Sequence, residues 1–158
     1  MPEGAFDVTL VLDCADTRMF PGGEPPSADD AGTVLVIDHH RTAMIELHDI
    51  SNTHFDMNHS GARLSWDFFH PGHPPPKLIS YIEDRDLWKW ELPYSKEFSA
   101  AFDMVPFTFE DFEKFEDDSV FDDAVKRGSY ILAYSKTVVK KICEKASRRR
   151  LAGLTASS

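Results

Sequence analysis

Two kinds of side chain that bind metal ions follow two short apolar runs in the first quarter of the chain. Asp13 follows the first run, and the triplet Asp38-His39-His40 follows the second. If both runs are parallel strands, their carboxyl ends meet at one crevice, which is where ligands collect in open α/β sheets. Carboxylate oxygen mixed with imidazole nitrogen suits Mn²⁺, Fe²⁺ or Zn²⁺, whereas an all-oxygen site suits Mg²⁺ or Ca²⁺. The residue types and their placement therefore predict a divalent metal site.

Each of these residues also has an ordinary structural interpretation. An acid that follows a strand is commonly a helix cap or a turn former, and a His-His pair is commonly found at the surface. Thiolate is absent from the pattern, which argues against a structural zinc site. The other histidines are interpreted as surface or loop residues, with His59 as the exception because it precedes a helix start that could receive phosphate.

The elements that must position the acids and histidines are short strands. Val8–Leu12 and Thr33–Ile37 are β-branched, continuously apolar runs between turn formers, which is typical of parallel strands buried on both faces. A third, weaker strand is predicted near Thr53–Phe55. The segment Pro21–Asp30 has the composition of a loop rather than of a crossover helix. These features predict an α/β fold with a parallel β-sheet flanked by helices.

Helical patterns begin at residue 60. Ser60 can cap a helix with a broad apolar face, and Pro76 suits the first turn of another helix that ends near Asp84–Asp86. The apolar face of the first helix is supplied by Ala62, Leu64, Trp66, Phe68 and Phe69. Phe121–Ala146 predicts one long helix, in which Gly128 is a tolerated weak point. The basic residues at its end are interpreted as a solvated last turn that complements the helix dipole, with phosphate contact as the alternative.

Composition narrows the function classes. A chain of 158 residues with 42% hydrophobic residues can bury one core, so we expect one domain. The formal charge of −10 argues against a surface that grips duplex DNA by its phosphates. No run is apolar enough for a membrane span or a signal peptide, and Cys14 and Cys143 do not form a disulfide framework. We therefore expect a cytoplasmic protein with reduced cysteines and no membrane partner.

Four segments carry a more specific pattern. They are Val11–Asp16, Val36–Ala43 with its Asp-His-His triplet, Phe55–Ala62 with its Ser-Gly-Ala helix start, and Ile82–Trp88. Val11–Asp16, the Asp-His-His triplet and Ile82–Trp88 resemble the second, third and fourth motifs of the DHH-family phosphoesterases. Phe55–Ala62 resembles a stretch found in a bacterial, oligoribonuclease-like branch of that family. The order and spacing of the four segments agree with the family from about residue 8 to residue 150. The resemblance implies a DHH-type domain over residues 1–150, followed by a tail over residues 151–158.

The resemblance also implies a role for each matching residue. Asp13 would bridge two metal ions, and His39 and Asp84 would bind the second ion. His40 would face the scissile phosphate as a catalytic residue. Asp38, the other implied catalytic residue, would fix the tautomer and ring orientation of the histidine pair.

The implied cofactor is Mn²⁺ or another divalent ion such as Mg²⁺ or Co²⁺, and the implied reaction is metal-assisted hydrolysis of a phosphate ester. His59, Ser60 and Arg85 are the candidate substrate-binding residues. Asp86 has two interpretations of about equal weight, a structural one as a helix cap or a partner of Arg85, and a functional one as an acid of the site.

The sequence departs from the family in two places. The first motif, a strand followed by His-x-x-x-Asp-x-Asp, is expected before Val8 and is not found there, so the domain is expected to be incomplete at its N-terminus. The second, substrate-gripping domain of the family is not found after Leu151. Two function classes stay open. One is a metal-dependent phosphoesterase acting on short oligonucleotides or small phosphate esters, inactive in this shortened form if it holds a single ion. The other is a catalytically dead metal-binding or protein-interaction module derived from such an enzyme. A homodimer also stays open.

Overall fold

The structure, a computed structural model, describes residues 9–13, 34–49, 52–106 and 108–155, which fall into two compact units. The first unit ends at Lys89 and the second begins at Trp90. The predicted loop Pro21–Asp30 lies outside the described residues. Among the helices that are described, none combines the length and the apolar character that crossing a membrane requires.

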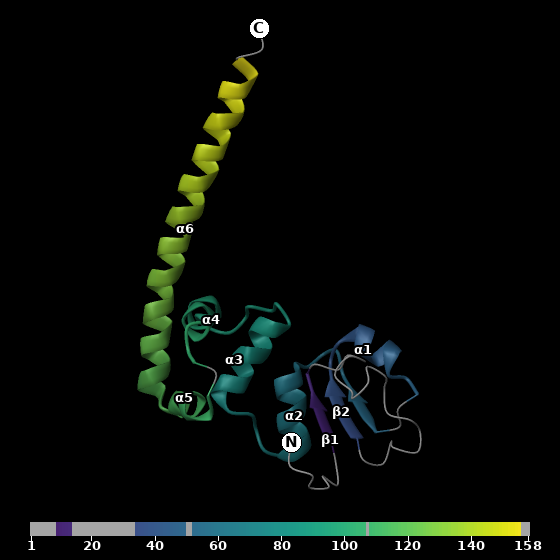
Figure 1. Ribbon diagram of the computed structural model, residues 1–158. Coiled ribbons are helices and arrows are strands. Elements are labelled where there is room, and N and C mark those ends of the chain that lie inside the picture. Colours follow the sequence, from purple (N-terminus) through teal and green to yellow (C-terminus); the bar gives the residue numbers. More distant parts are fainter. Residues whose placement is uncertain (1–8, 14–33, 50–51, 107, 156–158) are drawn as a thin grey trace, which may run out of the picture. The chain divides into compact units, whose positions relative to one another are not determined.

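A three-stranded parallel sheet forms the base of the first unit (Figure 1). Its strands are β1 (Thr9–Leu12), β2 (Val34–Asp38) and β3 (Thr53–Phe55), and β2 lies between the other two. Both pairings are parallel. The predicted α/β class with a parallel sheet is therefore confirmed, because each strand lies within a residue or two of the position that its apolar run indicated.

The core of the first unit lies where the central strand meets helix α1 (Arg41–Glu46). Val36 pairs with Val11 on one side and with Thr53 on the other, and it has no exposed surface. The buried cluster around it consists of Val11, Val34, Val36, Ala43 and Leu47. Continuous apolarity along β2 reflects this burial, because a central parallel strand covered on both faces has no solvent side.

Helix α2 (Gly61–Phe69) packs against β1 and β2, and helix α3 (Lys77–Asp86) packs against α2. Ser60 caps α2 as predicted, since its side chain accepts a hydrogen bond from the backbone N–H of Arg63. The apolar face of α2 is narrower than expected. Leu64 is buried, but Phe68 and Phe69 are each almost half exposed.

The second unit contains α4 (Ser95–Phe102), α5 (Phe109–Glu113), the 3₁₀ turn η4 (Lys114–Glu116) and α6 (Asp118–Thr155). The long helix is therefore confirmed and extends beyond both predicted ends. Stacked and edge-to-face rings with centroids 4.3–5.6 Å apart fill the space between these elements, and such pairs add to the burial energy. The rings belong to Phe98, Phe102, Phe112, Phe115 and Phe121.

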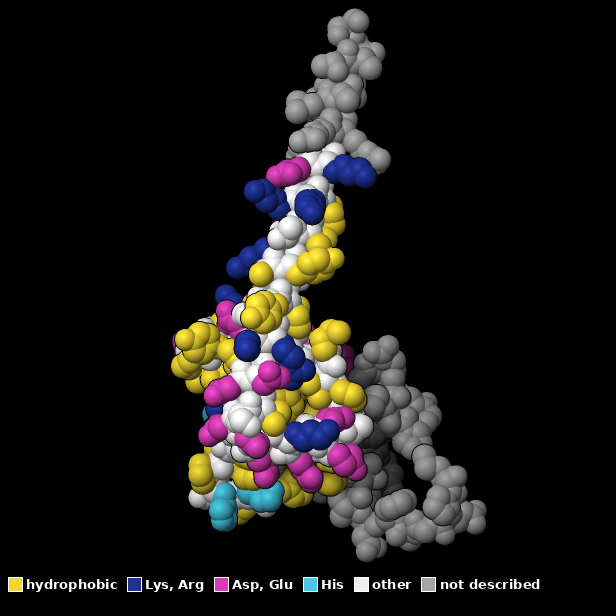
Figure 2. Space-filling view, turned by 90° about the vertical axis from the view of Figure 1, so that its left-hand side faces the viewer, with side chains coloured by type: hydrophobic (Ala, Val, Ile, Leu, Met, Phe, Trp, Pro, Cys, Tyr) yellow, Lys and Arg dark blue, Asp and Glu magenta, His cyan; other side chains and the backbone are white. Residues whose placement is uncertain are grey.

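Gly128 is where α6 crosses α4. It is buried, and a Cβ added there would overlap the backbone carbonyl oxygen of Glu97. The sequence suggested a tolerated weak point in a helix, whereas the structure shows a close approach of two helix backbones that only glycine permits. Farther along α6, Val139 and Ile142 are exposed, and Figure 2 shows apolar side chains along one edge of the helix with most Lys side chains on the other.

We predict that Gly128→Ala destabilises the second unit by about 1–3 kcal/mol, although alanine is the better helix former, because backbone rather than a flexible side chain blocks the added methyl group. Ser129→Ala, at the exposed neighbouring position, is the matched control and should change the free energy of unfolding by less than about 0.5 kcal/mol. Urea titrations followed by circular dichroism measure both. A Gly128→Ala variant as stable as the wild type would show that the helices can separate without cost.

Candidate metal site

The site begins with a buried carboxylate at the end of β2. Asp38 has no exposed surface, and its Oδ1 accepts hydrogen bonds from the backbone N–H of His39 at 2.6 Å and of His40 at 2.8 Å. The same oxygen lies 2.7 Å from Nδ1 of His40. Because a carboxylate only accepts hydrogen bonds when ionised, Nδ1 must carry the proton and Nε2 of His40 is the basic nitrogen. Asp38 thereby fixes both the backbone turn and one imidazole ring.

His39 points into the protein. Its side chain is 10% exposed, and its Nε2 lies 3.2 Å from Oδ1 of Asp13 and 3.3 Å from Oδ2 of Asp86. This nitrogen is buried, and no group in the described part of the chain gives it a hydrogen bond of adequate geometry. Donor atoms that share an ion at about 2.0–2.2 Å with angles of 90–109° are themselves about 3.0–3.5 Å apart. Both distances from Nε2 of His39 therefore match the separations of atoms that share an ion.

Asp13 reaches the cluster from β1 through an unusual backbone. Its φ of 55° is left-handed, a conformation that Asp tolerates better than most residues, and its N–H bonds to the carbonyl of Ile37 at 2.9 Å. A Cβ added at Gly61, the first residue of α2, would overlap the Asp13 carboxyl group. Burial raises the pKa of Asp13, while His39 acts to lower it and the neighbouring carboxylates Asp86 and Asp38 add to the rise. The acids at this point repel one another, so a cation would be favoured there.

Helix α3 contributes the third element, and it carries two candidate carboxylates, Asp84 and Asp86. The α3 carboxylate that lies near His39 is that of Asp86, the last residue of the helix. Asp84 is 4% exposed. Neither Asp84 nor Asp86 is among the four described residues whose ligand atoms gather, which are Asp13, Asp38, His39 and His40. Ligation by Asp84 stays a prediction.

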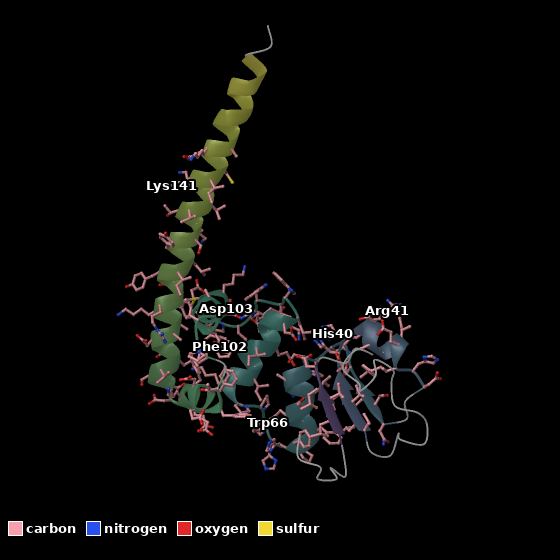
Figure 3. The ribbon with its side chains drawn as sticks, viewed as in Figure 1. His40, Arg41, Trp66, Phe102, Asp103 and Lys141 are labelled. Atoms are coloured by element: carbon pink, nitrogen blue, oxygen red, sulfur yellow. The ribbon has the colours of Figure 1, made fainter. Side chains whose placement is uncertain are left out.

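His40 is the exposed member of the histidine pair. Its side chain is 56% exposed, and its ring lies edge-on to that of His39 with centroids 4.2 Å apart. The hydrogen bond to Asp38 raises the pKa of His40, although partial burial opposes the rise. Figure 3 shows His40 at the edge of the sheet toward which the strands run, as predicted for residues that follow parallel strands.

The candidate substrate-binding residues lie around Glu83 and the start of α2. Glu83 accepts a hydrogen bond from the backbone N–H of Ser60 at 3.2 Å, and its carboxylate lies 3.2 Å from Nδ1 of His59. Ser60 is fully buried and serves as the cap, whereas His59 and Arg85 are partly exposed. The substrate contacts of all three stay predictions. The structure adds that the Glu83 carboxylate of α3 contacts both residues that precede α2, His59 and Ser60.

Sequence reasoning missed two residues of this arrangement. The sequence marks Gly61 only as part of a Ser-Gly-Ala helix start, and nothing local to it indicates that Asp13 packs on it. For Asp86, its place at the end of a predicted helix is the one local signal of a role at the site. Both are defined by contacts with residues far away in the sequence.

Comparison with known proteins gives one relative with a significant match. The chain is similar to an uncharacterized protein of Acanthamoeba polyphaga mimivirus, with 37% identity over 119 residues, or 74% of this chain. The chain spans 28% of the length of that protein. No family model and no solved structure matches the chain.

We predict that Gly61→Ala weakens the binding of Mn²⁺ at least tenfold and also destabilises the first unit by about 1–3 kcal/mol, because the new methyl group meets the Cβ of Asp13 as well as its carboxyl group, and rotation of the Asp13 side chain does not move its Cβ. Calorimetric titration and thermal unfolding of the same sample measure the two effects. Ala62→Ser, at the next position of α2, is the control. Unchanged binding in Gly61→Ala would mean that the Asp13 carboxylate does not take part in the site.

We also predict that, in protein treated with chelator, the His40 ring titrates above its ordinary pKa of about 6.5 and that Asp38→Asn lowers this pKa, because the carboxylate stabilises the imidazolium. The corresponding stabilisation is complete below the unfolded pKa and is lost as the pH rises through the folded pKa. NMR titration of the histidine rings gives the values. A His40 pKa that is the same in both proteins would contradict the prediction.

Proposed function

We propose that this chain is a metal-dependent phosphoesterase domain of the DHH type, which hydrolyses short oligonucleotides or small phosphate esters. The observation that carries the proposal is the buried Nε2 of His39, which lies 3.2–3.3 Å from carboxylate oxygens of two other elements. A nitrogen in this position loses its hydration without gaining a hydrogen bond, which is costly unless an ion is shared among the three groups.

The donor set fits Mn²⁺ better than Mg²⁺ because imidazole nitrogen accompanies carboxylate oxygen. Asp13, His39 and Asp86 would hold the ion. When bound, such an ion supplies Lewis-acid activation of water and of the phosphoryl group. Three protein ligands leave open positions for substrate and water, which is typical of catalytic rather than structural sites.

The protein groups around the ion have separate tasks. Asp38 orients His40 and keeps the proton on Nδ1 in the neutral ring, so that Nε2 of His40 faces outward from the turn. Protonated at Nε2, that ring would donate a hydrogen bond to a phosphoryl oxygen or a proton to the leaving oxygen. The raised pKa of His40 extends the pH range over which this protonated form is populated upward from the ordinary range of histidine.

The alternative, a metal-binding module without catalysis, draws on a different observation. The described residues contain one cluster of potential ligands, whereas two-metal phosphoesterases bind a pair of ions. Ion binding and turnover must therefore be measured separately.

The first test concerns ligands. In calorimetric titrations with Mn²⁺, the wild-type chain should bind roughly one ion, as expected for a single three-ligand site. His39→Ala should abolish binding, and Asp86→Asn should weaken it more than Asp84→Asn does. His48→Ala is a matched control, because His48 and Asp49 form an exposed pair at 3.2 Å outside the cluster. The opposite order for the two aspartates would support Asp84 as the ligand.

The second test concerns catalysis. Hydrolysis of a dinucleotide and of bis-p-nitrophenyl phosphate should require Mn²⁺ and should be lost in Asp13→Ala and in His40→Ala, with His40→Ala still binding the ion. Ion binding without turnover of either ester would support the binding module instead. Absence of ion binding would reject both functions.

A further inference from the structure

Helix α2 begins with only half of a capping box in its own sequence. Ser60 accepts a hydrogen bond from the backbone N–H of Arg63 at 3.1 Å. In a capping box, a Glu or Gln three residues after the cap accepts the N–H of the cap residue in return. Arg63 occupies that position here, and its guanidinium donates a hydrogen bond to Asp67 of the same helix. The acceptor for the N–H of Ser60 must therefore come from another element.

Glu83 of α3 supplies the missing acceptor. Its Oε2 accepts a hydrogen bond from the backbone N–H of Ser60 at 3.2 Å, and Ser60 has no exposed surface. The same carboxylate lies 3.2 Å from Nδ1 of His59 and 3.8 Å from Nζ of Lys89. The Glu83 side chain is 13% exposed, and a carboxylate removed from water needs donors of this kind. One side chain thus joins α3 to both residues that precede α2.

Each end of this connection leads to a carboxylate of the candidate metal site. On the α2 side, the first helical residue is Gly61, on which the Asp13 side chain packs so closely that an added Cβ would overlap it. On the α3 side, Asp86 comes three residues after Glu83, and residues at this spacing are neighbours on one face of a helix. The Asp86 carboxylate in turn approaches the buried imidazole nitrogen of the site. A shift between the start of α2 and the end of α3 would therefore change the separation of the two carboxylates.

We propose that Glu83 is the positioning residue of the metal site, which holds the first turn of α2 against Asp13 by accepting the N–H of Ser60. This inference rests on the proposed function and adds to it a residue that contacts neither the ion nor the substrate. The role belongs to the acceptor oxygen and not to the negative charge, because the group that is held is a backbone N–H. Two replacements of Glu83 therefore differ in their effect: Gln keeps an acceptor oxygen of the same reach, and Ala removes it.

The first test measures the affinity of the full chain for Mn²⁺ by calorimetric titration. Glu83→Ala should weaken binding about 10- to 100-fold, as is usual when a group that orients metal ligands is lost, whereas Glu83→Gln should stay within about threefold of the wild type. If Glu83→Ala does not fold, Glu83→Met takes its place, because it keeps the packing of the side chain without a strong acceptor. An equal loss of affinity in Glu83→Gln and Glu83→Ala would show that the charge acts on the ion directly and would overturn the positioning role.

Two controls separate positioning from a general loss of stability. Val34→Ala removes buried surface at the other end of β2, about 13 Å along the strand from Asp38, and should lower the unfolding temperature by several degrees without weakening Mn²⁺ binding. Glu46→Ala removes an exposed carboxylate at the end of α1 and should change neither quantity. A loss of affinity in Val34→Ala as large as that in Glu83→Ala would mean that affinity only follows stability, and it would reject a specific role for Glu83.

The second test needs no metal and so separates this inference from the proposed function. The N–H of Asp13 donates to the carbonyl of Ile37 at 2.9 Å, so its hydrogen exchange reports how firmly Asp13 is held. In chain treated with chelator, exchange at the amides of Ser60 and Asp13 should become at least about tenfold faster in Glu83→Ala and should stay unchanged in Glu83→Gln. Faster exchange at Ser60 alone would show that the connection does not reach Asp13, and it would overturn the inference. A wild-type chain that binds no Mn²⁺ would reject the proposed function, while exchange at these two amides would still decide whether Glu83 positions Asp13.

Discussion

The first unit depends on a carboxylate buried at the end of its central strand. Removing Asp38 from water costs several kcal/mol unless the charge is met by donors. The next two residues supply those donors, with two backbone N–H groups and one ring nitrogen on the same oxygen. This requirement fixes the turn after β2, and the turn directs the two following imidazoles differently. His39 is directed inward to the acids, and His40 is left half exposed.

The site is then assembled from the ends of elements. Asp13 follows β1, His39 follows β2 and Asp86 ends α3, so a small change in the length of any one would separate the ligands. The start of α2 limits such changes. Its first residue lies against Asp13, and its cap is bound through its N–H to Glu83 of α3. One helix terminus therefore sets the separation between the strand ligand and the helix ligand.

The sequence predicts some of these features well for a physical reason. A central parallel strand must be apolar on both faces, so β2 and the acid after it are recognisable without any partner. Asp84 and Asp86 could not be distinguished in this way, because residues two apart in a helix point in nearly opposite directions and a helix end is uncertain by one or two residues. The two close approaches, Gly61 to Asp13 and Gly128 to Glu97, depend on residues far earlier in the chain and leave no local pattern. The exposure of Phe68 and Phe69 shows the same limit, since composition gives the width of an apolar face but not how much of it is covered.

Three features that break local rules in the first unit lie close together in the structure. They are the left-handed Asp13, the buried charge of Asp38, and the buried nitrogen of His39 without a hydrogen bond. The secondary structure that surrounds them follows the rules, with a capped α2, an apolar central strand and a proline just before α3. A sequence under selection for stability alone would remove such costs one by one. Their retention around one group of carboxylates and imidazoles is an argument for a ligand at that place that does not depend on resemblance to any family.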